Sequence, residues 1–347
     1  MLDLASREAE VSNILSSIAL PGTSVSLVQA SLVRNTRVIE NDIYVRLFHG
    51  ADQYFLIDAV KSSLASLPWA KRIVVDTRTI LGVKRTLAIG SGKGGVGKTS
   101  VTVGMALTLR DEGYKVGILD ADVYGPNIST ALGAETISVE TSTRDDESIV
   151  FVPPEIDGLK VMSVGMLAEQ GQSLAWRGPI LTRLLKQFLF DVDWGNLDFL
   201  LIDLPPGTGD AQITLLQECP LVGVFLVGIP GMSSQADLSR TIAMYKQFSL
   251  PIVGYVENFS SIHCPHCGES FDFLLDKLPS DVNSMYDLNI SPLVRLSIVP
   301  DLLSRGENAS NKSLNTINPQ PFSILSKKCQ VERAMMLKIW QSLHHLE

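Results

Sequence analysis

A glycine-rich segment with two lysines is the part of this sequence whose residue types point most directly to chemistry. It runs Gly92-Lys-Gly-Gly-Val-Gly-Lys-Thr99 and matches the pattern G-x-x-x-x-G-K-T. Glycines let successive backbone N–H groups converge on one point, where the start of a helix adds partial positive charge. The segment predicts a nucleotide phosphate loop, with Lys98 on the β- and γ-phosphates and the Thr99 hydroxyl on Mg²⁺. The alternative is a glycine-rich turn without a ligand.

Acidic residues follow two apolar stretches, where magnesium and water chemistry would need them. The stretch 199–203 ends in Asp203, and Gly207 comes shortly after it. Asp203 can hold the water shell of the magnesium, and Gly207 can offer its N–H to a γ-phosphate and move when that phosphate leaves. Asp120 and Asp122 also follow a strand; one can orient an attacking water while the other stays near the metal. For a single Asp after a strand, the alternative is a helix cap.

A pair of cysteines forms a candidate metal knuckle. Cys264 and Cys267 are separated by Pro and His and followed by Gly, which brings two sulfurs to one side of a tight loop. Two thiolates do not complete a four-ligand site, and the remaining cysteines, Cys219 and Cys329, are single. The simplest route to four thiolates is a second copy of the knuckle from a symmetric partner. A zinc site that uses a neighbouring histidine, a redox pair and a turn without function are the alternatives.

Strands and helices that alternate along the chain are needed to position these motifs. The segment 99–112 reads as a helix, and apolar strands are expected at 87–90, 116–119, 198–202, 222–228 and 252–256. Such alternation means parallel strands with crossover helices, a doubly wound α/β fold with a mostly parallel sheet. Ligands bind beyond the carboxyl ends of the strands in such sheets. The polar segment 134–150 is expected to be a surface insertion or mobile loop, and 322–346 a terminal helix.

The first 80 residues differ in pattern from the rest of the chain. A helix is expected at about 7–20, strands within 25–48, a helix at about 56–67 and a strand at 72–75. This order predicts a small α+β domain at 1–80, ahead of a nucleotide-binding domain at 86–347. The N-terminal domain has no cysteine, and its single histidine, His49, lies beside Gly50 in a predicted turn, where we expect no chemical role.

Composition and charge exclude several classes of protein. The chain has 347 residues, of which 45% are hydrophobic and 19% charged, so a predominantly disordered protein is excluded. The net charge of −8 argues against a nucleic-acid-binding surface as the main activity. The first ten residues carry acids where a signal peptide would carry bases, and no apolar run reaches the ~20 residues that span a bilayer. We therefore expect a cytoplasmic protein with no nucleic-acid and no membrane partner.

A lysine near the start of the loop, Lys93, sets it apart from an ordinary nucleotide loop. In this respect it resembles the deviant-Walker group of P-loop ATPases, which includes nitrogenase iron protein, MinD and ParA proteins and the Mrp/ApbC iron–sulfur carriers. The strings Leu119-Asp-Ala-Asp-Val-Tyr-Gly-Pro126 and Asp203-Leu-Pro-Pro-Gly-Thr-Gly-Asp210 look most like the Mrp/ApbC branch. The likeness is strong between about 86 and 270, and the first 80 residues resemble the small domain often fused ahead of bacterial Mrp proteins.

The resemblance implies an ATP-hydrolysing homodimer that carries a 4Fe-4S cluster to apoprotein clients. Lys93 would reach across the dimer to the partner's phosphates, Asp122 would position the hydrolytic water, and Asp203 would hold the magnesium. Two Cys264/Cys267 pairs would bridge one cluster between the subunits. Asn258, which follows the strand at 252–256, would read the adenine. The residues expected at the nucleotide are thus Gly92, Lys93, Gly94, Gly95, Val96, Gly97, Lys98, Thr99, Ser100 and Asn258.

The sequence departs from this family in several places. Residues 228–235 lack the family's Thr-Thr-Pro-Gln stretch, Asn127 stands where the family's Tyr-Gly-Pro-Ser has serine, and 296–301 lack the usual preceding glycines. The N-terminal domain lacks the Asp-Pro-Glu and cysteine features of many relatives, so a protein-docking role is expected there rather than a cluster-related one.

A MinD- or ParA-like ATPase without a cluster, whose cysteine knuckle binds zinc, is the alternative function. MinD relatives need a basic amphipathic C-terminal helix, whereas the tail at 329–347 is only mildly basic. ParA relatives bind DNA through basic patches, which the net charge of −8 disfavours. Counting iron and zinc in the purified protein separates the two functions.

Overall fold

The structure of the protein is a computed structural model. It describes the chain in the segments 4–21, 23–123, 125–134, 137–144, 147–167, 178–230, 232–263, 267, 269–271, 292–298 and 319–329. The predictions that concern Cys264 and the chain beyond 329 lie outside the described residues.

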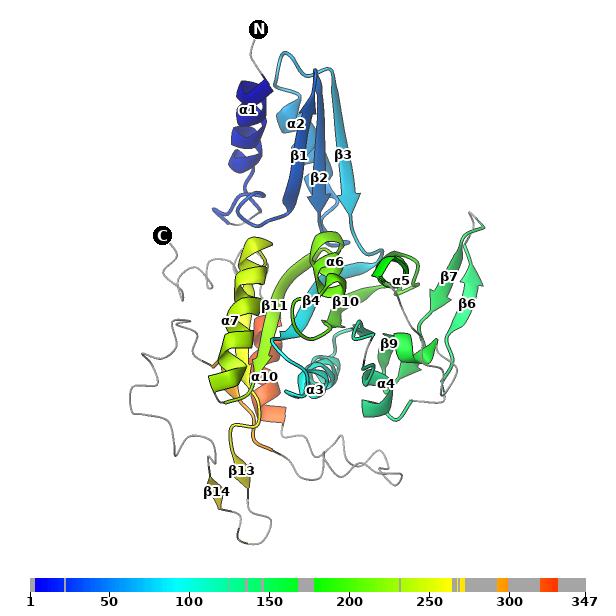
Figure 1. Ribbon diagram of the computed structural model, residues 1–347. Coiled ribbons are helices and arrows are strands. Elements are labelled where there is room, and N and C mark those ends of the chain that lie inside the picture. The colour runs from blue at the N-terminus through cyan, green and yellow to red at the C-terminus, as the bar shows by residue number, and fades with distance from the viewer. Residues whose placement is uncertain are drawn as a thin grey trace.

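Residues 4–78 form a three-stranded sheet with two helices packed against it (Figure 1). The middle strand pairs antiparallel with the first and parallel with the third. Apolar side chains of both helices and of the sheet bury one shared cluster. The elements are α1 Leu4–Ser17, β1 Val33–Ile39, β2 Asp42–Phe48, α2 Phe55–Leu64 and β3 Arg72–Arg78. Their order agrees with the order expected from the sequence, and we refer to them together as the N-terminal unit.

An eight-stranded sheet forms the centre of the remaining chain, in the order β15-β12-β11-β4-β10-β5-β9-β8. Every neighbouring pair is parallel except β8 with β9, which is antiparallel. The strands are β4 Val83–Ser91, β5 Val116–Asp120, β8 Glu155–Ile156, β9 Leu159–Ser163, β10 Leu197–Asp203, β11 Leu221–Gly228, β12 Ile252–Glu257 and β15 Val294–Arg295. The doubly wound α/β fold predicted from the sequence is confirmed.

Helices cover both faces of this sheet and bury a separate apolar cluster on each (Figure 1). One face carries α5 Gly178–Phe190, α6 Asp210–Glu218 and α7 Met232–Gln247. The other carries α3 Lys98–Asp111, α4 Ile128–Ala131 and α10 Pro319–Cys329, with the short 3₁₀ turn Val164–Met166 beside them. Because the strands are enclosed on both sides, β5 is buried at every residue, which agrees with the apolar residues that precede its final Asp120.

The segment 134–150 differs from its prediction as a mobile loop. Residues Glu140–Thr143 and Ile149–Val152 pair antiparallel as β6 and β7. The outer strand β6 is exposed at all four residues, so the segment does lie on the surface. The inner strand β7 anchors it, because Val150 is buried and the Phe151 ring meets that of Phe188 edge-on at 6.1 Å. The apolar residues at 149–152 thus hold this otherwise polar insertion in place as a β-ribbon.

Different parts of the chain lie at the amino and at the carboxyl ends of the central strands. The N-terminal unit lies at the amino ends of the strands, where the Ala51 N–H donates to Val83 O at 2.9 Å (Figure 1). The phosphate-loop segment and the small hairpin of β13 Ile262–His263 and β14 Ser270–Phe271 lie at the opposite, carboxyl edge. Among the helices that the structure describes, none has the length and apolar character needed to cross a bilayer.

Candidate functional site

The phosphate-loop segment connects the end of β4 to the start of α3, as predicted. Gly95 and Gly97 have φ angles of 76° and 80°, a left-handed conformation that glycine adopts without strain. A Cβ at Gly92 would lie 2.6 Å from the Asp237 backbone, and one at Gly97 would lie 2.2 Å from Asn258 Nδ2. A Cβ at Gly95 would meet nothing within 4 Å. Two glycines thus allow close packing of the loop, while the third leaves its outer side open to a ligand.

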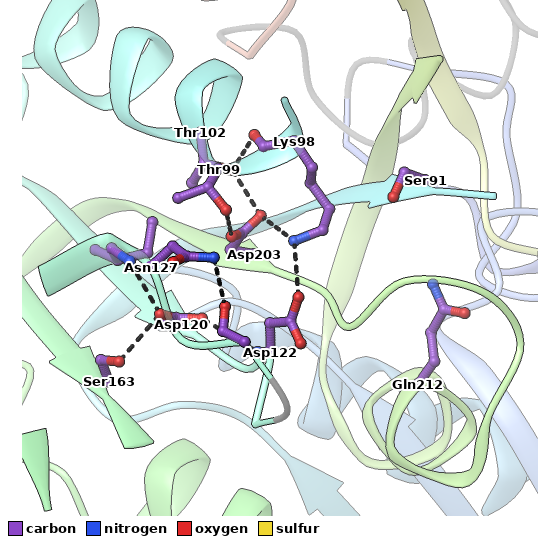
Figure 2. Close-up of polar contacts among 12 residues, drawn as sticks. Ser91, Lys98, Thr99, Thr102, Asp120, Asp122, Asn127, Ser163, Asp203 and Gln212 are labelled. Atoms are coloured by element: carbon purple, nitrogen blue, oxygen red, sulfur yellow. Dashed lines mark hydrogen bonds and ion pairs between the residues drawn. The ribbon is translucent and has the colours of Figure 1, made fainter. Parts of the chain in front are cut away.

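A buried ion pair lies beneath the loop. Lys98 Nζ is 2.8 Å from Asp203 Oδ1, and neither side chain is exposed by more than 7% (Figure 2). The Thr99 hydroxyl donates to Asp203 Oδ2 at 2.7 Å, and the Thr102 hydroxyl lies 3.0 Å from Asp203 Oδ1. Both oxygens of Asp203 are therefore held, one by Lys98 and Thr102 and the other by Thr99. A carboxylate fixed in this way presents a defined set of oxygen lone pairs beneath the loop.

Asp122 lies on the other side of the Lys98 ammonium, with its Oδ2 3.8 Å from Nζ (Figure 2). The lysine thus stands between two carboxylates from different strand ends. Its positive charge offsets theirs in a buried environment, where like charges repel strongly. The sequence placed Asp122, Lys98 and Asp203 in one site, and the structure brings these three side chains together.

Asp120, two residues earlier, has different surroundings. Its carboxylate accepts hydrogen bonds from the backbone N–H groups of Asp122 and Ile128, each at 3.1 Å, and from the Ser163 hydroxyl at 3.0 Å. Burial, together with the nearby charge of Asp203, raises the pKa of Asp120 to about 7, against the opposing effect of these hydrogen bonds. Asp120 orders the loop that follows β5, a role close to the capping alternative.

Other residues predicted at the nucleotide lie around the loop. Asn258 Nδ2 donates to Val96 O at 2.9 Å, so this side chain supports the phosphate loop from the end of β12. Gly207, with φ 81°, donates its N–H to Ser91 O at 3.1 Å, which joins the segment after Asp203 to the loop. The Lys93 ammonium makes no ion pair within the described residues. A lysine without such a partner has its charge available to a ligand or a second subunit.

The cysteines do not form a metal site within the part of the chain that the structure describes. No group of three or more His, Cys, Asp or Glu side chains lies at metal-binding distance there. Cys267 is exposed and follows β13, whereas Cys264 is outside the described residues. Cys219 is fully buried, and burial raises the pKa of its thiol. Cys219 is thus a core residue, and of the two knuckle cysteines the structure describes Cys267 alone.

Two polar residues of the site were not among those predicted from the sequence. Thr102 follows Thr99 by three residues on α3, which places both hydroxyls on one face of the helix, so helical spacing was a usable signal. Ser163 comes from β9, a strand that was not predicted, and its contact with Asp120 follows from β9 pairing with β5. Local spacing gave no signal for Ser163.

Comparisons with known proteins agree with this geometry. A sequence model of ParA proteins, described as NUBPL iron-transfer P-loop NTPase, matches residues 82–330. The chain belongs to this family. An iron-sulfur cluster carrier protein of Helicobacter pylori is 37% identical over 257 residues, which are 74% of this chain and 68% of the relative. One of Synechocystis sp. is 32% identical over 337 residues, which are 89% of this chain and 95% of the relative.

A solved structure is also similar to this NUBPL-family chain. It is a nucleotide-binding protein of Archaeoglobus fulgidus in complex with ADP, with a TM-score of 0.53 and 31% identity. The match covers 76% of this chain and 95% of the other. The resemblance to Mrp/ApbC-type carriers inferred from the sequence is therefore confirmed, and the loop at 92–99 belongs to a P-loop NTPase fold.

Proposed function

We propose that this protein is an ATP-hydrolysing homodimer that carries a 4Fe-4S cluster and transfers it to apoproteins. The observation that carries this proposal is the arrangement of Lys98, Thr99, Asp122 and Asp203 under an open glycine loop. Positive charge, a hydroxyl and two carboxylates there have the complementary roles that phosphoryl transfer requires. The relatives named iron-sulfur cluster carrier proteins support the choice of cargo.

The residues under the loop fit Mg²⁺ as well as phosphate. The Thr99 hydroxyl and the Asp203 carboxylate are hard oxygen donors that already lie within 2.7 Å of each other. When bound, the ion would neutralise charge on the β- and γ-phosphate oxygens. Lys98 now donates one of the three N–H groups of its ammonium to Asp203, so a bound phosphate would share this positive charge with the carboxylate.

Hydrolysis needs an oriented water and a further positive charge, and both have candidates here. Asp122 is close to Lys98 yet keeps some exposure, which suits a carboxylate that positions a water. Lys93 would supply its charge to the phosphates of the second subunit, as the family resemblance implies. The exposed Gly94 and Gly95 beside it leave room for an approaching partner.

The cluster would be a cargo held by the cysteine knuckle. Cys267 is exposed and lies in the chain between β13 and β14, the hairpin at the carboxyl ends of the central strands, where the phosphate loop also lies. Two thiolates per chain require two chains for four ligands, so Cys264 and Cys267 of both subunits would hold one 4Fe-4S cluster. Nucleotide-dependent changes in the dimer would then alter how firmly the cluster is held. The net charge of −8 is consistent with a cytoplasmic carrier that uses neither nucleic acid nor membrane as a partner.

Two lysine variants test the nucleotide part of the proposal. Lys98→Ala should abolish measurable Mg·ATP binding in calorimetry, because it removes the phosphate ligand and leaves two buried carboxylates uncompensated. Lys93→Ala should bind ATP as the parent does but hydrolyse it at least about tenfold more slowly, because a charge supplied in trans acts on the transition state.

A mixing experiment separates a trans role of Lys93 from one within its own subunit. Asp122→Asn chains lack the water-positioning carboxylate but retain Lys93. Mixed with Lys93→Ala chains, they should restore part of the hydrolysis rate, since each supplies what the other lacks. If the mixture is no more active than either variant alone, Lys93 does not act across a dimer.

A cysteine variant tests the cargo. After anaerobic reconstitution, the parent should hold about four iron atoms per dimer and show the brown colour of a 4Fe-4S protein. The double change Cys264→Ser with Cys267→Ser should remove both, while the buried Cys219→Ala should retain them. One zinc per chain in the parent, or iron that survives the double change, would contradict the cluster assignment.

A further inference from the structure

The two helices of the N-terminal unit pack on one side of its three-stranded sheet. Val38, Ile43 and Val45 point toward α1 and α2 and are at most 5% exposed. Successive residues of a strand point to opposite sides, so the alternate residues point away from the helices. None of these alternate residues belongs to the buried cluster of the unit. We call the side formed by the alternate residues of 35–39 in β1, 42–46 in β2 and 72–78 in β3 the open face.

The open face is rich in arginine. It carries four arginines and two aspartates, and neither a lysine nor a glutamate. Its formal charge is therefore positive, whereas the whole chain has a net charge of −8. The buried centres of protein–protein interfaces are enriched in arginine and aromatic residues and poor in lysine and glutamate. Both the charge and the composition of the open face thus set it apart from the average surface of this protein.

Two of the four arginines have their charge available to a partner. Arg37 and Arg72 are exposed, and neither makes an ion pair within the described residues. The other two share one acid, because Arg46 Nε and Arg78 Nη1 each lie 2.9 Å from a different oxygen of Asp76. The Asp76 carboxylate is thus compensated inside the face, while the guanidinium groups of Arg37 and Arg72 are not.

Apolar side chains lie among these charges. Tyr44 is half-buried in the middle strand, in register with Arg37 on one side and Val74 on the other. Ile39, which is 57% exposed, is in register with Asp42, the second acid of the face. Residues in register share one side of a sheet, so Arg37 and Val74 flank the tyrosine ring. A surface of this kind offers apolar contact and charge to the same ligand.

We propose that the open face binds an acidic segment of a partner protein. Carboxylates of the segment would pair with the guanidinium groups of Arg37 and Arg72, which can hold a carboxylate through two parallel hydrogen bonds. Apolar side chains of the segment would cover Tyr44. Three strands spaced ~4.8 Å apart, with seven residues rising ~3.3 Å each, give a face of about 10 by 20 Å. These dimensions suit one extended segment of a partner.

The acids of the open face favour a peptide over a nucleic acid. Arginines also attract phosphates, but a nucleic acid brings a charge at every nucleotide. Asp42 and Asp76 lie within the face and would repel such a continuous row of charges. A peptide can instead place an amide N–H or an apolar side chain opposite these two acids.

This docking site is independent of ATP hydrolysis and cluster transfer. The open face belongs to the N-terminal unit, which lies at the amino ends of the central strands, whereas the phosphate loop lies at their carboxyl ends (Figure 1). Its contact with the central domain is at one end, where Arg78 Nε lies 3.5 Å from Glu218 Oε2 of α6. Failure of the docking site would therefore leave the ATPase proposal untouched, and the reverse also holds.

Fluorescence anisotropy with the full-length chain tests this site. The probe is a labelled octapeptide of alternating glutamate and leucine with blocked ends, and we expect saturable binding that weakens as salt is added. Arg37→Gln and Arg72→Gln, at exposed positions without ion pairs to lose, should each weaken binding by about two- to fivefold. A peptide with serine in place of leucine should bind less tightly, because Tyr44 then loses its apolar contacts.

A control variant and a second probe decide the outcome. Lys61→Gln removes the same charge from an exposed position of α2, on the other side of the sheet, and should leave peptide binding unchanged. Equal weakening by Lys61→Gln and Arg37→Gln, or no saturable binding to the parent, would overturn the site. Oligothymidylate that binds more tightly than the peptide, and is lost in the Arg37→Gln, Arg72→Gln double variant, would overturn the peptide in favour of a nucleic acid.

Discussion

Asp120 and Asp122 show how two carboxylates so close in sequence acquire different chemistry. Asp120 is the last residue of β5 and is wholly buried, whereas Asp122 faces Lys98 from the following turn. The sequence identified both acids because an apolar strand leads into them. The pattern of residues could not distinguish them, and only the family resemblance singled out Asp122, because the difference depends on Ser163, Ile128 and Asp203, which come from elsewhere in the chain.

The raised pKa of Asp120 predicts a pH dependence of stability. Its pKa is about 7 in the folded protein and near 3.8 when unfolded, so the folded state binds more protons between these values. The free energy of unfolding should therefore fall as pH rises from about 4 to about 7, as far as Asp120 contributes. Asp120→Asn cannot ionise, so its stability relative to the parent should rise across that window and level off above it.

Chemical denaturation of nucleotide-free protein at a series of pH values measures this difference. Asp198→Asn is the control of opposite sign. Although partial burial opposes it, hydrogen bonds from Lys84 and the Lys115 N–H lower the pKa of Asp198, so its contribution to stability is lost as pH falls. A parent-to-Asp120→Asn difference that does not change between pH 4 and pH 7 would show that Asp120 is not protonated in this range.

At the scale of elements, the phosphate loop depends on how closely β4 and α7 pack. A Cβ at Gly90 would lie 2.0 Å from the Tyr245 hydroxyl, which itself accepts from Gln212 Nε2 at 2.9 Å. Tyr245 is fully buried, so the ring cannot move aside into solvent. The glycine before the loop is therefore needed for packing, in addition to the loop glycines needed for backbone conformation.

This contact predicts a pair of compensating substitutions. Gly90→Ala should destabilise the protein by about 1–3 kcal/mol through overpacking. Tyr245→Phe should cost about 1–3 kcal/mol, because the buried Gln212 amide loses its acceptor. The double variant should lose less than the sum, since removing the hydroxyl makes room for the new methyl group. Denaturant unfolding of the four proteins gives the coupling energy. Strictly additive losses would show that the methyl group introduced by Gly90→Ala does not collide with the Tyr245 hydroxyl.

Contacts between elements far apart in the sequence account for most of the secondary structure that could not be predicted. The main strands and α3 have apolar runs and glycine punctuation, and they were located to within a few residues. The ribbon of β6 and β7 was not located. The polar sequence of its outer strand is like that of a loop, and the ribbon depends on the contacts that Val150 and Phe151 make with the interior. In the same way, the short edge strands β8 and β15 owe their conformation to neighbouring strands and have too few residues for a periodic pattern.

In the molecule as a whole, α6 and α7 run from the carboxyl ends of the central strands to their amino ends. α6 begins just after the Asp203 segment, and both helices end against the N-terminal unit (Figure 1). There, Arg34 Nη1 donates to the Leu216 carbonyl of α6, and the Ser31 hydroxyl donates to Ser249 O, just after α7, at 3.0 Å. Burial lowers the pKa of Arg34 to about 10, with nearby Cys219 opposing the shift, so its guanidinium is still charged at neutral pH.

Arg34 is thus one polar link, beside the 3.5 Å ion pair of Arg78 with Glu218, that we expect to join unfolding of the N-terminal unit to that of the central sheet. Its guanidinium also stacks on Phe48, 4.1 Å from the ring centroid. Arg34→Met keeps an apolar stem but leaves the Leu216 carbonyl without its donor, at a cost of about 1.5–3 kcal/mol. In the parent, the amides of β1 and β2 and those of β4 should all be protected from exchange with solvent. In Arg34→Met, the amides of β1 and β2 should exchange faster than those of β4. Arg37→Met, an exposed change on the same strand, should preserve the parent pattern. Equal protection of both sheets in Arg34→Met would mean that the other contacts between the two parts are enough to unite their unfolding without Arg34.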